Sequence, residues 1–247
     1  MRYGVVAATG ELVHEMPIEL PGPRSPHDIT ITERYSIVHD FPFFHDVDLL
    51  RKHGYRVARF YPDLPSRFGV VPRRGRAEEV RWFDFAPGYV LHMVNAWEDG
   101  DWIVMDGCFQ PDPTIRRNKE EGELASMLGY LRVRSHLHRW RMNLRTGESR
   151  EEQLDDLNVE FCLPDTERYG ERTRYSYHQW IPVDNFTVEF HALVKYDHES
   201  GSSRRHDYGE GIFGSEAPFA ARSGASAEDD GYVVTIVSDR GTLRSQC

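Results

Sequence analysis

The apolar segments of this chain are short and alternate with polar residues, and this period of two limits the folds open to it more than any other feature. Side chains of a β-strand point alternately to the two faces of a sheet, so alternation over about four to eight residues predicts a half-buried strand. The pattern recurs in DITITERYSIVHDF, GYVLHMVNAW, DWIVMDGCF, RYSYHQWI, FTVEFHALVKYD and GYVVTIVSD. We therefore expect an all-β protein.

Turn clusters of one kind separate these segments: AATGEL, WEDGDW, LRTGES, DHESGS, EDDGYV and SDRGTL. Glycine beside Asp, Ser or Thr supplies the positive φ that tight hairpins require. Short strands at regular spacing fit a sandwich, a barrel or a propeller, and similar hairpins that recur without sequence identity favour a β-propeller. Helical periodicity is confined to EEGELASMLGYL and DVDLLRKHGY.

The longer irregular stretches are predicted to be loops within one domain. They are PGPRSP, PSRFGVVPRRGR and SEAPFAARSGASAEDD, and the same alternation of strands and turns continues on both sides of each. A chain of 247 residues can bury one large core. We expect residues 1–247 to form a single domain.

Charge and composition exclude several classes of function. The formal net charge of −10 argues against nucleic-acid binding, and the basic stretch RVRSHLHRWRMNLR is interpreted as a solvated strand face. Since no apolar run approaches the ~18 to 20 residues needed to span a bilayer, and no secretory signal is present, we expect a cytoplasmic protein without a transmembrane segment. The three cysteines are widely spaced and odd in number. They indicate neither a disulfide framework nor a CxxC zinc site, and we expect reduced thiols.

Two of the twelve histidines stand out from the rest. His27 and His92 each lie where a Pro/Gly-rich or aromatic loop meets a strand, in PRSPHDITIT and YVLHMVNAWE. On residue type alone, a hydrogen-bonded core histidine is more common than a metal ligand at such positions. The histidines in polar or turn contexts are expected to be exposed; these are His14, His53, His198 and His206.

Six segments in a fixed order carry a resemblance over essentially the whole chain: HDITIT, RFGVVPRRG, HMVNAWE, NVEFCLP, LVKYDHESG and GSEAPFAARSGASAEDDGY. Together they resemble the central part of the carotenoid cleavage oxygenase family, which includes the lignostilbene dioxygenases. The resemblance implies a seven-bladed β-propeller, of which this chain would hold an incomplete set of blades. It also implies a non-haem Fe(2+) on the propeller axis, held by four histidines. With O2 as co-substrate, such enzymes cleave a conjugated C=C bond of a carotenoid, apocarotenoid or stilbene to two carbonyl products.

Matched residue by residue, His27 and His92 resemble two of the four iron ligands. Glu160 of NVEFCLP resembles the glutamate that steadies the ligand at His92, and Glu216 of GSEAPFAAR resembles the one that steadies the last ligand of the family. Neutral imidazole suits ferrous iron. A carboxylate that accepts the far N–H of a ligating histidine fixes its tautomer and strengthens its donor atom.

The neighbours of His92 receive simpler interpretations. Asn95 and Glu98 are expected to anchor the end of their strand by local hydrogen bonds. Five aromatic residues suit either a channel for a flat apolar substrate or ordinary core packing. They are Phe41, Phe43, Phe44, Trp97 and Phe161.

The resemblance leaves the other two iron ligands without a counterpart in this chain. The alternative to an oxygenase is therefore a truncated, non-catalytic propeller fragment or a binding module without a complete iron site. We expect an apolar, conjugated small molecule as the substrate. We also keep open a peripheral membrane contact and a partner chain that supplies the missing blades.

Overall fold

The structure is a computed structural model that describes residues 1–24, 26–54, 58–184 and 187–247. Its described part is built almost entirely from antiparallel strands. The strands are β1 (Arg2–Val6), β2 (Leu12–Pro17), β3 (Thr30–Ile31), β4 (Tyr35–Asp40), β5 (Phe43–His45), β6 (Ala58–Phe60), β7 (Ser66–Pro72), β8 (Arg81–Phe85), β9 (Tyr89–Asp99), β10 (Trp102–Gln110), β11 (His136–Asn143), β12 (Ser149–Gln153), β13 (Val159–Leu163), β14 (Tyr175–Trp180), β15 (Ala192–Asp197), β16 (Ser202–Asp207), β17 (Ile212–Phe213), β18 (Phe219–Ala221), β19 (Gly231–Val233), β20 (Val237–Asp239) and β21 (Arg244–Gln246). The helices are α1 (Val47–His53) and α2 (Ala125–Leu131), with short 3-10 turns at Ala77–Glu79, Lys119–Leu124 and Thr166–Arg168.

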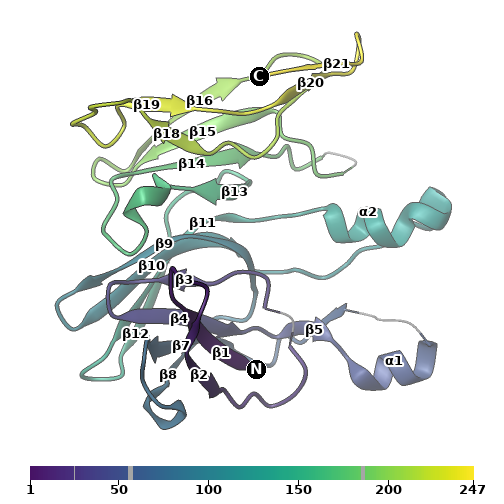
Figure 1. Cartoon of the computed structure of the whole chain (residues 1–247). Helices are drawn as coiled ribbons and strands as arrows, with labels where there is room; N and C mark the ends of the chain where they lie inside the picture. The colour runs from purple at the N-terminus through teal and green to yellow at the C-terminus, as the bar shows by residue number, and fades with distance from the viewer. Residues whose placement is uncertain (25, 55–57, 185–186) are drawn as a thin grey trace.

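Three four-stranded sheets follow one another along the chain and are stacked in Figure 1. Their strand orders are β3-β4-β7-β8, β9-β10-β11-β12 and β13-β14-β15-β16. Smaller pieces flank them, with β1 paired to β2 before the first sheet and β17, β20 and β21 forming a fourth, three-stranded sheet. The sheets do not close into a ring, which agrees with the incomplete set of blades expected from the sequence.

The first strand of each sheet lies at the same edge of the stack. Strand β9 contacts β3 on one side and β13 on the other. Between the first two sheets, the core is packed with large apolar side chains such as Phe68, Met105 and Trp140. Val94, Leu137 and other apolar residues fill the space between the second and third sheets. Burial of these side chains supplies the main favourable energy for stacking the sheets, and it brings three first strands together.

Glycine turns close several of the hairpins as the sequence predicts. Gly100, Gly147 and Gly201 all have positive φ, at 59°, 82° and 67°, in the turns that connect β9 to β10, β11 to β12 and β15 to β16. A side chain at these positions would strain the backbone. Both predicted helices are also present, as α1 and as the 3-10 turn that leads into α2.

Several predicted boundaries are wrong. The stretch PSRFGVVPRRGR contains β7, a central strand buried on both faces, whose continuous apolar run lacks the alternation of a half-exposed strand. The loop predicted around SEAPFAAR contains β18, and among the described residues of FTVEFHALVKYD only Ala192–Asp197 forms a strand. The basic stretch is not a solvated face, since β11 is a central strand and Arg139 pairs with the buried Asp106 at 2.7 Å.

Candidate metal centre

His27 and His92 meet although 65 positions separate them in the sequence. His27 lies in the loop before β3 and His92 on β9, and their Nε2 atoms are 3.3 Å apart. The rings are nearly perpendicular, with an interplanar angle of 77°. Two ligands at roughly 90 to 110° on a metal with bonds of about 2.1 Å lie about 3.0 to 3.4 Å apart. The separation of the two nitrogens therefore suits two neighbouring ligands of one metal ion.

Glu160 orients His92 from the adjacent sheet. It lies on β13, is fully buried, and accepts a hydrogen bond from His92 Nδ1 at 2.6 Å. With its proton on Nδ1, His92 presents the lone pair of Nε2 toward His27. Burial lowers the pKa of His92, but the hydrogen bond and charge of Glu160, with the charges of Asp28 and Glu216, outweigh burial and raise the pKa overall. The second carboxylate oxygen, Oε1, is buried without a hydrogen-bond partner among the described residues.

An irregularity in β13 brings three consecutive residues against His92. Glu160 pairs with Gln179 but Leu163 pairs with Tyr177, so β13 contains one residue more than its partner strand. The backbone at Phe161 has φ of 53°, an uncommon conformation for a bulky residue that tends to be retained where it serves a function.

As a result, side chains on both sides of the irregularity turn toward β9. The Phe161 ring lies 4.7 Å from the His92 ring, and Cys162 Sγ lies 3.5 Å from the His92 carbonyl oxygen. A regular strand would direct alternate side chains to opposite faces.

Asp28 holds the loop that carries His27. Its Oδ2 accepts a hydrogen bond from the Met93 N–H at 2.8 Å, and its Oδ1 accepts one from the Ile29 N–H at 2.7 Å. The carboxylate thus ties the loop to the residue that follows His92. Asp28 is a site residue that was not predicted from the sequence, although its place directly after His27 in HDITIT was the available signal.

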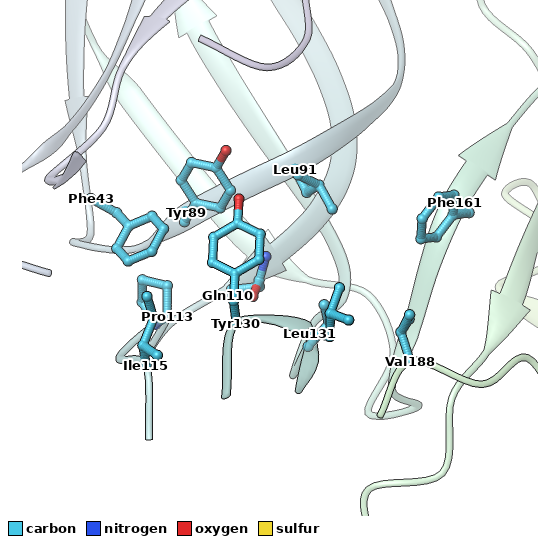
Figure 2. Close-up of a pocket in the computed structure, with 11 residues that line it drawn as sticks. Phe43, Tyr89, Leu91, Gln110, Pro113, Ile115, Tyr130, Leu131, Phe161 and Val188 are labelled. Carbon is cyan, nitrogen blue, oxygen red and sulfur yellow. The ribbon is translucent and has the colours of Figure 1, made fainter. Parts of the chain in front are cut away.

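An apolar pocket begins beside Phe161 and extends toward α2, with a cavity volume of about 80 Å³ and an opening to solvent (Figure 2). Tyr89, Gln110 and Tyr130 contribute the polar atoms of its wall. The apolar lining residues are Phe43, Leu91, Pro113, Ile115, Leu131, Val133, Phe161 and Val188. Phe161 separates the pocket from the histidine pair, because its side chain lines the pocket and its ring contacts the His92 ring.

Only two of the five aromatic residues considered for a channel line this pocket, namely Phe43 and Phe161. Phe41 and Trp97 are buried in the core, and Phe44 stacks on Tyr61 with ring centroids 4.8 Å apart. The sequence could not separate these roles, because packing and ligand binding both select aromatic side chains.

The two polar neighbours of His92 serve the framework as expected, but their hydrogen-bond partners are distant in the sequence rather than local. Asn95 is fully buried, donates to the Glu171 carbonyl at 2.8 Å and accepts from the Gly170 N–H at 3.0 Å, which fixes the loop between β13 and β14. Glu98 accepts hydrogen bonds from Thr32 Oγ1 and from the Arg34 backbone N–H, at 2.8 and 2.9 Å.

Glu216 lies farther out than Glu160. It is exposed, in the segment between β17 and β18, and its carboxylate has no hydrogen bond or ion pair with any residue that the structure describes. Its charge nevertheless acts on His92. A histidine for Glu216 to orient, as the resemblance implies, is not found beside it in the described ranges.

The exposure predicted for the remaining histidines holds only in part. His206 is exposed, whereas the side chain of His198 is only 9% exposed and hydrogen-bonds Ser176 at 2.8 Å. His14 is half-buried, and the side chain of His53 lies outside the described residues.

Comparison with known proteins places the chain in a family. The family described as "RPE65: Retinal pigment epithelial membrane protein" matches residues 1–247. The carotenoid 9,10(9',10')-cleavage dioxygenase of Crocus sativus is 30% identical over 99% of this chain and 46% of its own length. Isoeugenol monooxygenase of Pseudomonas nitroreducens is 29% identical over 99% of this chain and 52% of its own length. The chain thus spans about half the length of these relatives.

Solved structures agree with this assignment. The lignostilbene dioxygenase of Pseudomonas brassicacearum aligns with a TM-score of 0.83 and 26% identity, covering 99% of this chain and 53% of that one. Cobalt-substituted Synechocystis ACO aligns with a TM-score of 0.84 and shares the fold at 24% identity, covering 97% and 50% of the two chains. The predicted partial propeller is thereby confirmed, and the chain belongs to the RPE65 and carotenoid cleavage oxygenase family.

Proposed function

We propose that this chain contributes His27 and His92 to an Fe(2+) site and belongs to a dioxygenase that cleaves a conjugated C=C bond with O2. The observation that carries the proposal is the 3.3 Å approach of the two Nε2 atoms, with His92 held by Glu160 from behind. Two imidazoles aimed at one point, backed by a buried carboxylate, are typical of a metal site with an ordered outer shell. The names of the carotenoid cleavage dioxygenase of Crocus sativus and the lignostilbene dioxygenase of Pseudomonas brassicacearum support the reaction class.

A bound ferrous ion would supply open coordination positions and electrons for the activation of O2. The protein's own residues have separate tasks. Glu160 keeps the proton of His92 on Nδ1, so that Nε2 is free to ligate, and Asp28 keeps the His27 loop against β9. Glu216 would add negative charge near the centre.

The substrate we propose is an apolar, conjugated small molecule of the carotenoid, apocarotenoid or stilbene class. The pocket in Figure 2 supports this choice, since its wall is mostly apolar and aromatic and its lining residue Phe161 contacts the His92 ring. Apolar pockets with a few placed polar groups are the usual form of small-molecule sites. The three polar side chains of the wall would orient whichever polar end such a molecule carries.

Peripheral contact with a membrane is part of the proposal. Helices α1 and α2 extend from the same side of the molecule in Figure 1. Leu50 on α1 is 38% exposed, and Met127 and Tyr130 on α2 are 52% and 51% exposed. Because Tyr130 also lines the pocket, an apolar substrate could enter from a lipid surface near α2. In the described part of the chain, no helix is long and apolar enough to cross a membrane.

The alternative function is a non-catalytic propeller fragment or binding module. It is favoured by the presence of only two of the four expected ligand histidines, and it predicts no stable iron binding. A partner chain that supplies further blades would allow the chain to be incomplete alone and part of a dioxygenase in the complex. The cytoplasmic location and the single domain expected from the sequence remain predictions.

Anaerobic titration of the 247-residue chain with Fe(2+) tests the proposal, with iron retained per folded chain as the readout. We expect retention by the wild type, loss of retention in His92→Ala, and no change in His206→Ala, a matched substitution of an exposed histidine on β16. Equal iron retention in His92→Ala and wild type would overturn the ligand assignment. No retention by the wild type would assign the isolated chain to the non-catalytic alternative.

A further inference from the structure

A second group of metal-ligating side chains lies buried between the second and third sheets. Cys108 on β10, Cys162 on β13 and His178 on β14 each direct one ligating atom to a common point, and the three atoms all lie within 4.8 Å of one another. Cys108 and His178 are fully buried and Cys162 is 2% exposed. Both thiols are free, as expected from the sequence, but their proximity was not predictable from a spacing of 54 residues.

The geometry of the group suits a tetrahedral zinc ion. With a Zn–S bond of about 2.3 Å and a Zn–N bond of about 2.0 to 2.1 Å, ligands at a tetrahedral angle place sulfur and nitrogen about 3.5 Å apart. The observed separation between Cys108 Sγ and His178 Nδ1 is 3.6 Å. Two thiolates would also neutralise the charge of Zn²⁺, which removes the main cost of burying a divalent ion.

A hydrogen-bonded chain prepares His178 to act as a ligand through Nδ1. Ser176 Oγ lies 2.8 Å from His178 Nε2 and 2.8 Å from His198 Nε2, and His198 Nδ1 lies 3.7 Å from Asp106 Oδ2. The negative charge of Asp106 favours a proton on His198 Nδ1, so Nε2 of that ring accepts from the Ser176 hydroxyl. The hydroxyl oxygen then accepts from His178 Nε2–H, which leaves the lone pair of Nδ1 facing Cys108 Sγ.

This arrangement is the outer-shell support that ligating histidines usually have. Asp106 is itself fixed by two hydrogen bonds from Arg139, at 2.7 and 2.8 Å. Burial lowers the pKa of His178, which keeps the ring neutral and able to bind a metal. The sequence prediction of an exposed His198 was wrong, because the turn residues after His198 suggested a solvent-facing position. The hydrogen bonds that join His198 to His178 through Ser176 were therefore not predicted.

We propose that Cys108, Cys162 and His178 form a Zn²⁺ site, distinct from the histidine pair, that links the second sheet to the third. On binding, each thiol releases one proton and each sulfur forms one bond to zinc, with no change of oxidation state. A bound zinc ion would also fix the irregular segment of β13, because Cys162 follows Phe161 and contacts the His92 carbonyl oxygen.

Titration of the reduced, metal-free 247-residue chain with Zn²⁺ and with Co²⁺ tests this proposal. Native mass spectrometry should show one bound zinc, and a pH indicator in weakly buffered solution should record the release of two protons for each zinc bound. Cobalt should give a thiolate-to-metal charge-transfer band in the near ultraviolet, which an all-histidine site cannot produce. The band should disappear in Cys108→Ser and Cys162→Ser but persist in Cys247→Ser, which changes the exposed cysteine, and in His92→Ala.

Each other outcome overturns the proposal. A wild-type chain that binds no zinc, or binds it without loss of two protons, lacks the site. A charge-transfer band that survives both buried cysteine substitutions, or vanishes in Cys247→Ser or His92→Ala, has another origin. If the buried cysteine variants fail to fold, the proton loss measured on the unmodified chain decides the question alone.

Discussion

Replacing Glu160 with glutamine isolates the contribution of one carboxylate charge to the proposed iron site. Glutamine has nearly the same shape and can still accept from His92 Nδ1, whose distance to the carboxylate is 2.6 Å. A hydrogen bond to a charged group contributes about 1.5 to 3 kcal/mol and a neutral one about 0.5 to 1.5. The difference, about 1 to 1.5 kcal/mol, corresponds to about five- to twelvefold in affinity at ~1.4 kcal/mol per decade.

The total loss of Fe(2+) affinity in Glu160→Gln should be somewhat larger than the difference between the two hydrogen bonds. Glu160 is completely buried, so water does not screen its charge from a cation bound at His92. Loss of such a carboxylate behind a ligating histidine typically weakens metal binding ~10- to 100-fold. We therefore expect the dissociation constant for Fe(2+) to rise about 10- to 100-fold in Glu160→Gln, with little change in folding.

The assay is anaerobic competition for Fe(2+) between the chain and a chelator, combined with thermal unfolding followed by circular dichroism. Glu151→Gln is the matched control, because Glu151 accepts from His138 Nε2 at 3.2 Å in the second sheet, away from the proposed iron site. The reasoning fails if Glu160→Gln binds iron as tightly as wild type, or if Glu151→Gln weakens binding equally.

Three further substitutions probe the surroundings of the site. Asp28→Ala removes two hydrogen bonds that hold the His27 loop, and we expect iron affinity to fall about tenfold. The control Asp63→Ala, in an exposed turn, should leave iron affinity unchanged. Equal effects of the two substitutions would refute the positioning role of Asp28. Asn95→Ala leaves buried backbone groups unpaired, and denaturant unfolding should show a loss of about 2 to 4 kcal/mol; a loss under 1 kcal/mol would contradict its anchoring role. Burial lowers the pKa of His39 to about 4 from 6.5. The imidazole of His39 therefore takes up a proton more readily in the unfolded chain, and the free energy of unfolding falls as the pH drops from 6.5 toward 4. Between pH 7 and 4.5 we expect this residue to account for about 2 kcal/mol of lost stability, so His39→Gln should lose correspondingly less than wild type in unfolding titrations at the two pH values.

Local patterns predicted the elements well and their limits less well. Alternation located β9, β10 and β14, because their sequences place polar residues such as Asn95, Asp106 and Gln179 among the apolar ones, although both faces of these strands are largely buried. It missed β7, since the FGVV run in this strand is apolar throughout and does not alternate. Tertiary burial, rather than local preference, decides that case.

In the candidate site, too, the sequence predicted some features and the tertiary structure decided others. HDITIT, HMVNAWE and NVEFCLP pointed to His27, His92 and Glu160 through resemblance, and the folded chain brings all three together. The positive φ of Phe161 had no signal in the sequence, because local preference favours glycine or asparagine in that conformation. The surrounding sheets hold the backbone there against its intrinsic preference.

By itself, then, the sequence determined that the chain forms strands joined by glycine turns, and which histidines and glutamates are available for metal chemistry. These follow from side-chain periodicity and residue type, which are local properties. Only the tertiary structure decided that His92 faces His27, that β13 turns three consecutive residues toward one histidine, and that Cys108 lies beside Cys162 and His178. Such juxtapositions depend on how whole sheets stack, because burial of apolar side chains between the sheets, and not any local preference, sets which distant residues meet.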